Sequence, residues 1–325
     1  QNVKPITNFA ARLLTTHMTN NTKGILLSLN TAILWATLAI ALKVALNYID
    51  SYTIVWWRFL VAFGSIALFM AVKTPSSLKI LVKPPLSLVA AAILLGFNFI
   101  GYQQGVNYGG PLVAQIIIQL GPVLLAFAGF FMFKEKADTI RIAGFILTAV
   151  GFVVFYYYQL DFIPGKEELQ TGFLWLLMGS VTWTGYAIIN KMVVNKYSTS
   201  EISLMLYAIP MLMFLPFADF STLFQAHSIG VWFLFLFLAF NTLLAYGSLS
   251  LALKYIDANK ISVIITLNPI ITVLLMEILL WINVSWFSTD ALAPMAYIGA
   301  LVVLIGAIMA VGVFSKKANK GKANP

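Results

Sequence analysis

The chain contains no cysteine, and this absence excludes several kinds of chemistry. None of its 325 residues is Cys, and only His17 and His227 are histidine. Disulfides, thiol catalysis and cysteine-ligated metal sites are therefore excluded, and the two histidines have no partners at metal-ligand spacing. The sequence also lacks a P-loop, a G-x-S-x-G elbow and an H-E-x-x-H pair. We expect a protein that is not an enzyme, hydrolyses no ATP, and holds neither a metal nor a cofactor.

Charged residues are scarce as well. They make up 10% of the chain, against about 25% in soluble domains, while 61% of the residues are hydrophobic and the mean hydropathy is +0.91. The apolar runs are long and continuous, which favours transmembrane helices over the short alternating strands of a barrel. We expect an all-α integral membrane protein whose net charge of +9 reflects basic cytoplasmic loops, not binding of nucleic acid.

Ten apolar segments predict ten transmembrane helices. Polar or turn-forming stretches such as NYGGP and KYSTS separate them, and no long hydrophilic domain interrupts the series. The predicted helices span residues 24–46, 52–72, 86–107, 112–133, 139–158, 171–194, 201–218, 229–251, 261–282 and 293–314.

The distribution of basic residues predicts the orientation of these helices. If successive segments alternate in direction, Lys and Arg gather in the loops of one side, whereas the opposite loops are mainly acidic. The positive-inside rule then places both termini in the cytoplasm. We interpret the first 22 residues as a polar tail without a cleavable signal peptide, and the first helix as an uncleaved anchor. The expected location is a bacterial cytoplasmic (inner) membrane.

The two halves of the chain repeat each other. An offset of 148 residues places Trp35 on Trp183 and Lys43 on Lys191, and an offset of 147 places Pro122 on Pro269. Five helices per half is an odd number, so the second half enters the membrane from the opposite side, as in many secondary transporters. The expected parts are a tail (1–22), a first repeat (23–158), a periplasmic linker (159–170), a second repeat (171–314) and a basic tail (315–325).

In these features the sequence resembles the drug/metabolite transporter superfamily, in its ten-helix EamA-type branch, over about residues 24–314. The resemblance is carried by the paired Trp and Lys, by WWRFL at 56–60, by QLGPVLLAFAGFFMFKEK and by LNPIITVLLMEILL. It implies two five-helix repeats around a central cavity, which helices 1, 3, 4, 6, 8 and 9 line, and export of small metabolites such as amino acids. Glu277 departs from the pattern. In the first half Glu135 closes helix 4, whereas the corresponding loop of the second half has no Glu and Glu277 lies inside helix 9.

Polar and aromatic side chains recur at helical spacing within the helices that this arrangement places around the cavity. Amides facing lipid would be costly, so they face protein, either as interhelical hydrogen bonds or as the wall of a polar, aromatic site. We consider the following residues candidates for substrate binding: Trp35, Asn98, Tyr102, Gln115, Gln119, Trp183, Tyr186, Asn190, Asn241, Tyr246 and Thr266.

Five further residues are candidates for coupling or gating. Glu277 is the one acid well inside an apolar helix, and it is either a buried, paired carboxyl or a proton-coupling group. Lys43 and Lys191 either extend to the interface or act as gates. Pro122 and Pro269 should kink their helices near mid-membrane.

A further cation, Arg58, lies about a turn and a half into helix 2. Because that helix is expected to be peripheral, we expect a structural role for Arg58 and no cation near the centre. Phosphorylated substrates, which need several cations, are therefore disfavoured.

Together these features predict a secondary-active transporter that exports small polar metabolites, amino acids or aromatic compounds, by alternating access. Its partners would be the substrate, the lipid bilayer and, in one version, protons. The alternatives are proton-coupled uptake and efflux of drugs or quaternary amines. A channel and an intramembrane enzyme are weaker alternatives.

Overall fold

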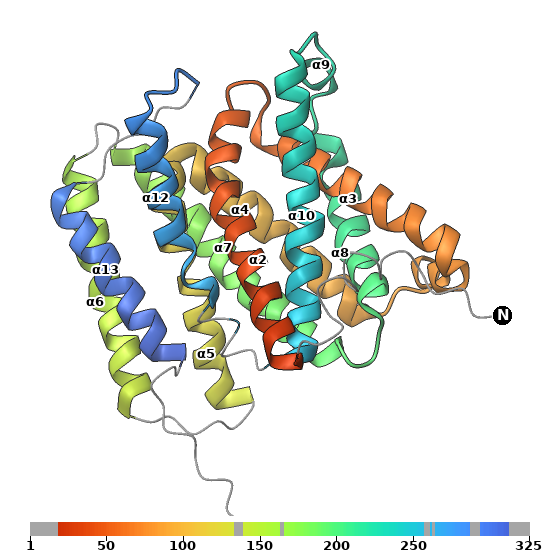
Figure 1. Ribbon diagram of the computed structural model, residues 1–325, viewed down its shortest axis with the longest axis horizontal. Helices are drawn as coiled ribbons and strands as arrows, with labels where there is room; N and C mark the ends of the chain where they lie inside the picture. Colours follow the sequence, from red (N-terminus) through yellow and green to blue (C-terminus); the bar gives the residue numbers. More distant parts are fainter. Residues whose placement is uncertain are drawn as a thin grey trace, which may run out of the picture.

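The computed structural model describes residues 19–132, 139–162, 166–256, 261, 264–286 and 293–311, and their regular structure is entirely helical (Figure 1). Seven helices are long and apolar enough to cross a membrane, and two shorter ones, α12 and α13, are apolar. This confirms an all-helical membrane protein. The helices are α2 (Asn20–Ala45), α3 (Ser51–Lys73), η1 (Pro75–Leu81), α4 (Leu86–Ile117), α5 (Leu120–Met132), α6 (Thr139–Phe162), α7 (Lys166–Val193), α8 (Thr199–Phe214), η2 (Leu215–Phe217), α9 (Phe220–Leu223), α10 (Ile229–Tyr255), α12 (Asn268–Trp281) and α13 (Pro294–Val311).

Short polar caps set where the apolar helices begin. The side chain of Asp50 accepts hydrogen bonds from the backbone N–H groups of Tyr52 (2.8 Å) and Thr53 (3.1 Å) and so starts α3. Ser198 and Glu201 form a reciprocal capping box at the start of α8. Such caps satisfy N–H groups that lack partners inside the helix. Both helices therefore begin within two residues of the predicted positions.

Helices extend into both ends of the stretch 159–170, which the sequence predicts as a periplasmic linker. Helix α6 continues to Phe162 and α7 begins at Lys166. Glu167 and Glu168 lie in the first turn of α7, where negative charge is favourable to the helix dipole. Most of the predicted linker is therefore helical.

Gly110 divides α4 into two helical segments. Its φ of 77° and ψ of 170° are non-helical, and Pro111 follows directly. Asn98 and Gln115 lie on opposite sides of this break yet line the same pocket. On a straight helix they would be about 26 Å apart. The chain therefore turns back at Gly110, within the NYGGP stretch that separates two predicted helices.

The two predicted mid-membrane kinks are breaks between helices. Ile118 and Gln119 form a turn between α4 and α5, and Thr266 and Leu267 form a turn before α12. Pro122 and Pro269 lie in the first turn of the helix that follows, where proline is tolerated. The predicted disruption is therefore present at both places, as a short turn ahead of the proline instead of a bend within one helix.

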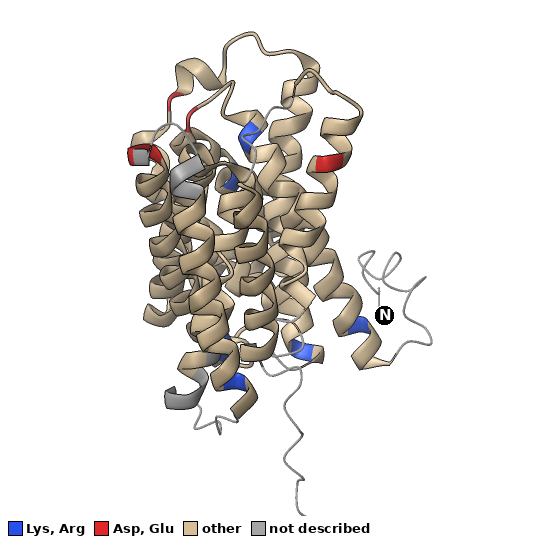
Figure 2. Ribbon diagram, turned by 90° about the vertical axis from the view of Figure 1, so that its left-hand side faces the viewer, with Lys and Arg blue, Asp and Glu red and all other residues tan. Residues whose placement is uncertain are grey.

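The helices of the two halves make equivalent contacts. Helix α5 packs on α7 as α12 packs on α2, and α4 packs on α8 as α10 packs on α3. Helices α6 and α13 lie side by side at one edge of the bundle (Figure 1). In Figure 2 the visible Asp and Glu lie towards the upper end of the bundle, and most of the visible Lys and Arg lie at the lower end.

Candidate functional site

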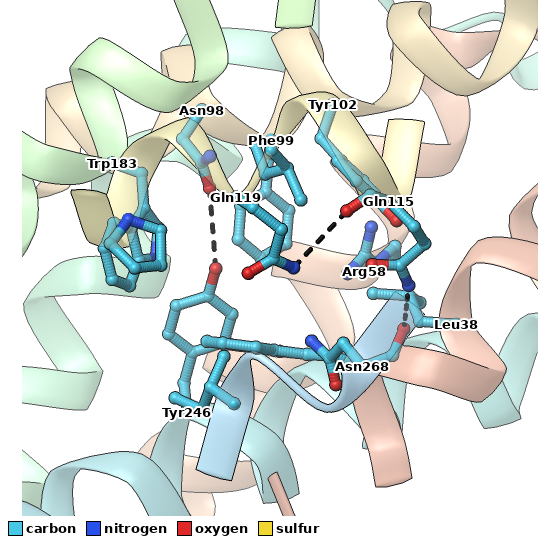
Figure 3. Close-up of a pocket in the computed structure, with 14 residues that line it drawn as sticks. Leu38, Arg58, Asn98, Phe99, Tyr102, Gln115, Gln119, Trp183, Tyr246 and Asn268 are labelled. Atoms are coloured by element: carbon cyan, nitrogen blue, oxygen red, sulfur yellow. Dashed lines mark hydrogen bonds between the residues drawn. The ribbon is translucent and has the colours of Figure 1, made fainter. Parts of the chain in front are cut away.

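A pocket lies in the centre of the bundle, between helices of both halves. Its cavity of about 70 Å³ is bounded by α2, α3, α4, α5, α7, α10 and α12, together with residues at the breaks before α5 and α12 (Figure 3). The lining residues are Trp35, Leu38, Arg58, Asn98, Phe99, Tyr102, Gln115, Ile118, Gln119, Pro122, Trp183, Tyr246, Ile265 and Asn268. Seven of the eleven substrate-binding candidates are among them.

Aromatic rings form much of the pocket wall. The ring of Tyr246 contacts that of Trp35 edge-on, with centroids 5.4 Å apart, and lies 5.4 Å from the ring of Phe99. Trp183 lies in the wall as well. Because Trp35 and Trp183 are equivalent under the repeat, each half supplies one indole to the same pocket.

Amide side chains supply the polar part of the wall, and backbone carbonyls hold several of them in place. Gln115 Nε2 donates to the Trp35 carbonyl (3.0 Å), Gln119 Nε2 donates to the Gln115 carbonyl (3.3 Å) and Asn98 Nδ2 donates to the Gly179 carbonyl (3.0 Å). The hydroxyl of Tyr246 donates to Asn98 Oδ1 (3.5 Å; Figure 3). The buried oxygens Gln119 Oε1 and Asn268 Oδ1 have no protein partner among the described residues. The wall thus presents hydrogen-bond acceptors as well as aromatic surface.

The structure corrects the sequence-based expectation for Arg58. This side chain is only 2% exposed, and it forms part of the pocket wall. Its Nε donates to Thr242 Oγ1 on α10 (3.0 Å), and its guanidinium carbon lies 4.5 Å from the centre of the Phe99 ring. The expectations that helix 2 is remote from the cavity and that no cation lies near the centre were therefore wrong.

Five other candidates lie outside this pocket. Tyr186, Asn190 and Lys191 line a second cavity, together with Trp183, and Asn190 Nδ2 donates to the Tyr186 hydroxyl (3.3 Å). Asn241 is buried and donates to the Leu34 carbonyl (2.6 Å), which matches the interhelical alternative. Thr266 is buried in the turn before α12.

Two of the coupling candidates are also placed away from the pocket. Lys43 Nζ donates to the Asn107 carbonyl (3.4 Å). Glu277 is exposed on the surface of α12. Glu277 lines none of the described pockets, and its coupling role stays a prediction.

Six pocket residues were not among the sequence-based candidates: Leu38, Arg58, Phe99, Ile118, Ile265 and Asn268. A usable signal existed for Asn268, because it stands next to Pro269 in the equivalent of the QLGP stretch. For Arg58 the sequence gave less indication of a place in the pocket, because the neighbouring residues are apolar on every side of the helix and mark no polar face.

Comparison with known proteins agrees with this architecture. The model of the EamA-like transporter family matches residues 22–157 and again residues 170–312. The chain belongs to the EamA-like transporter family. It is a multi-pass membrane transporter by that membership, and the family model matches once in each half of the chain.

Several relatives extend over nearly the whole chain. An "uncharacterized transporter" of Haemophilus influenzae is 33% identical over 88% of this chain and 94% of its own length. The "uncharacterized inner membrane transporter YhbE" of Escherichia coli K12 is 32% identical over 88% of this chain and 90% of its own length. A solved structure described as "Crystal structure of protein" has a TM-score of 0.62 at 18% identity, covering 88% of this chain and 96% of that one. This last likeness concerns the fold alone.

Proposed function

We propose that this EamA-like protein exports small metabolites such as amino acids or aromatic compounds across the bacterial inner membrane by alternating access. The observation that carries the proposal is the central pocket, where both halves contribute aromatic and amide side chains to one cavity. Ligand pockets typically combine apolar walls with a few fixed polar groups. The unpartnered oxygens of Gln119 and Asn268 would accept hydrogen bonds from N–H or O–H groups of a substrate.

The proposed topology is ten transmembrane passes in two inverted repeats, with both termini in the cytoplasm. The positive-inside rule supports this orientation, and the turn at Gly110 supports counting α4 as parts of two passes. The equivalent breaks before Pro122 and Pro269 support the inverted repeat, because discontinuous helices at the repeat interface are typical of secondary transporters.

Counterflow in liposomes tests the proposal. Vesicles containing the purified protein are loaded with unlabelled compound and then given a trace of the labelled form. The compounds are amino acids, aromatic metabolites, quaternary amines and sugar phosphates. A carrier accumulates the label transiently, whereas a channel cannot, so absence of counterflow with every compound would contradict the proposal.

A matched pair of variants links transport to the pocket. Trp35→Ala removes an indole from the pocket wall and should reduce counterflow strongly. Trp281→Ala removes an indole that is 85% exposed on α12 and should leave counterflow unchanged. Equal effects of the two substitutions would indicate that the pocket is not the transport site.

Among the alternatives, efflux of quaternary amines is disfavoured by Arg58. A fixed guanidinium in the pocket wall repels a permanent cation, and the low dielectric strengthens this repulsion. Proton-coupled uptake remains an alternative mode of the same carrier, and counterflow measured with and without a pH gradient tests it.

A further inference from the structure

Arg58 is a buried cation without an anionic partner among the described residues. A guanidinium has five N–H donors, and the described acceptor for Arg58 is Thr242 Oγ1, which receives the Nε proton. Phe99 covers the guanidinium at 4.5 Å by a cation–π contact but satisfies none of the in-plane donors. Since Arg58 lines the central pocket, the donors of its two terminal nitrogens are available to a molecule bound there.

We propose that Arg58 anchors a carboxylate of the transported substrate, so that this carrier selects metabolites bearing a carboxylate. The inference rests on the proposed function, because it assumes that the substrate enters the central pocket. An unpaired charge in a water-poor interior is costly. A bound carboxylate offsets that cost, whereas a neutral or cationic compound does not.

Two helix ends add to the positive character of the pocket. Helices α5 and α12 begin at Leu120 and Asn268, and Gln119 and Asn268 both line the pocket. The first turn of a helix carries a partial positive charge from the aligned peptide dipoles. In transporters, such half-helix starts near mid-membrane point at anionic substrate groups. No acidic side chain lies among the lining residues to neutralise this field.

The geometry favours a carboxylate over a phosphate. The planar guanidinium fork matches the two oxygens of a carboxylate. Recognition of a phosphate dianion usually involves several cations, and Arg58 is the one Lys or Arg side chain in the lining of this pocket. A monocarboxylate with an apolar or aromatic body would place its charge at Arg58 and its body against Trp35, Trp183 and Tyr246.

Three related compounds test the inference on the full-length protein in detergent. Phenylalanine, phenylpropanoate and phenethylamine share one aromatic body, and only the last lacks a carboxylate. At equal millimolar concentration, the two carboxylates should raise the apparent unfolding temperature and phenethylamine should not. Arg58→Gln should weaken carboxylate binding by about 10- to 100-fold, since hydrogen bonds between charged groups contribute about that factor.

Two further variants separate the anchor from general effects of charge and folding. Arg58→Lys keeps the charge but loses the fork, and it should bind carboxylates with intermediate affinity. Lys73→Gln removes the same charge from the exposed far end of the same helix, and its affinity should be unchanged. If Arg58→Gln does not give a monodisperse protein, the comparison of Arg58→Lys with Lys73→Gln still decides the question.

Several outcomes would overturn the inference. They are stabilisation by phenethylamine equal to that by the acids, undiminished carboxylate binding by the Arg58 variants, stronger stabilisation by phenyl phosphate as a fourth compound, and no shift with any carboxylate. Counterflow with the same compounds distinguishes the two proposals. Transport of the amine but not of the acids would keep the carrier and refute the anchor, whereas binding of the acids without counterflow would keep the anchor and refute the carrier.

Discussion

The contact between α6 and α13 offers a sharp test of the packing. A Cβ added at Gly144 would lie 2.7 Å from the carbonyl carbon of Met309 and 2.8 Å from Cα of Ala310. These are backbone atoms, which cannot rotate away. The backbone nitrogen of Ala310 lies closer still, so the helices would have to separate locally by more than about 0.7 Å, the difference between 2.7 Å and the 3.4 Å at which ordinary contact begins. Gly144→Ala therefore overpacks a helix–helix interface.

The magnitude follows from a comparison with a second glycine. An added Cβ at Gly64 on α3 meets no atom within 4 Å. Both substitutions gain helix propensity, about 1 kcal/mol for Gly to Ala, but only Gly144→Ala adds an overpacking cost of about 1–3 kcal/mol. The difference between the two variants isolates the packing cost. Gly64→Ala should unfold at or above the wild-type temperature, and Gly144→Ala should unfold several degrees below Gly64→Ala.

Thermal unfolding in detergent, with size-exclusion chromatography as the readout, measures this difference. No residue of α6 or α13 lines the central pocket among the described residues, so the shift caused by a bound ligand should persist in both variants. Equal unfolding temperatures for Gly144→Ala and Gly64→Ala would refute the close approach of α6 and α13.

Three other predictions concern the loops and the surface. Gly110→Ala should lower the unfolding temperature, because φ is 77° and ψ is 170° there and an L-residue in that region costs about 1–3 kcal/mol. Glu277→Gln should leave the pH dependence of transport unchanged, since Glu277 lines none of the described pockets; a lost dependence in counterflow assays would support a coupling role. The hydrogen bond from the Ser221 hydroxyl, with backbone N–H groups, lowers the pKa of Asp219. The Asp219 side chain caps α9, and this cap should hold above the usual Asp pKa and weaken as the pH falls through the lowered value. Hydrogen exchange of the α9 amides should therefore become faster at low pH in the wild type but not in Asp219→Asn.

Much of the fold could be predicted from the sequence because a membrane demands long apolar helices. The length of each apolar run predicted the spans, and the Gly-Gly-Pro at 109–111 predicted the turn that now divides α4. The repeat predicted that Trp35 and Trp183 occupy equivalent positions in the two halves, and the structure places both indoles in one pocket wall. These features depend on local residues or on the repeat.

The direction in which single charged side chains point was not predictable in this way. Arg58 stands among Trp56, Trp57 and Phe59, so α3 has no polar face that would reveal where the pocket lies. Its direction is set by the partner helix, through Thr242 on α10. Glu277 likewise stands in an apolar helix, and its exposure depends on which neighbours α12 has. Both are tertiary properties, which periodicity within one helix does not contain.

The two halves contribute unequally to the pocket, with ten lining residues from the first half and four from the second, and Arg58 adds a difference in charge. The offset of 148 that pairs Trp35 with Trp183 places Leu206 opposite Arg58, so the second half has no equivalent cation. A substrate anchored by its carboxylate would therefore bind in one orientation relative to both halves. Arg58 is itself held across the halves, because its Nε bonds Thr242, and Trp57 Nε1 donates to the Phe235 carbonyl on the same helix (3.1 Å). If α3 and α10 move together during alternating access, Arg58 keeps its position relative to α10 throughout the cycle. The substrate carboxylate can then stay bound to Arg58 and need not transfer to a group on the other half.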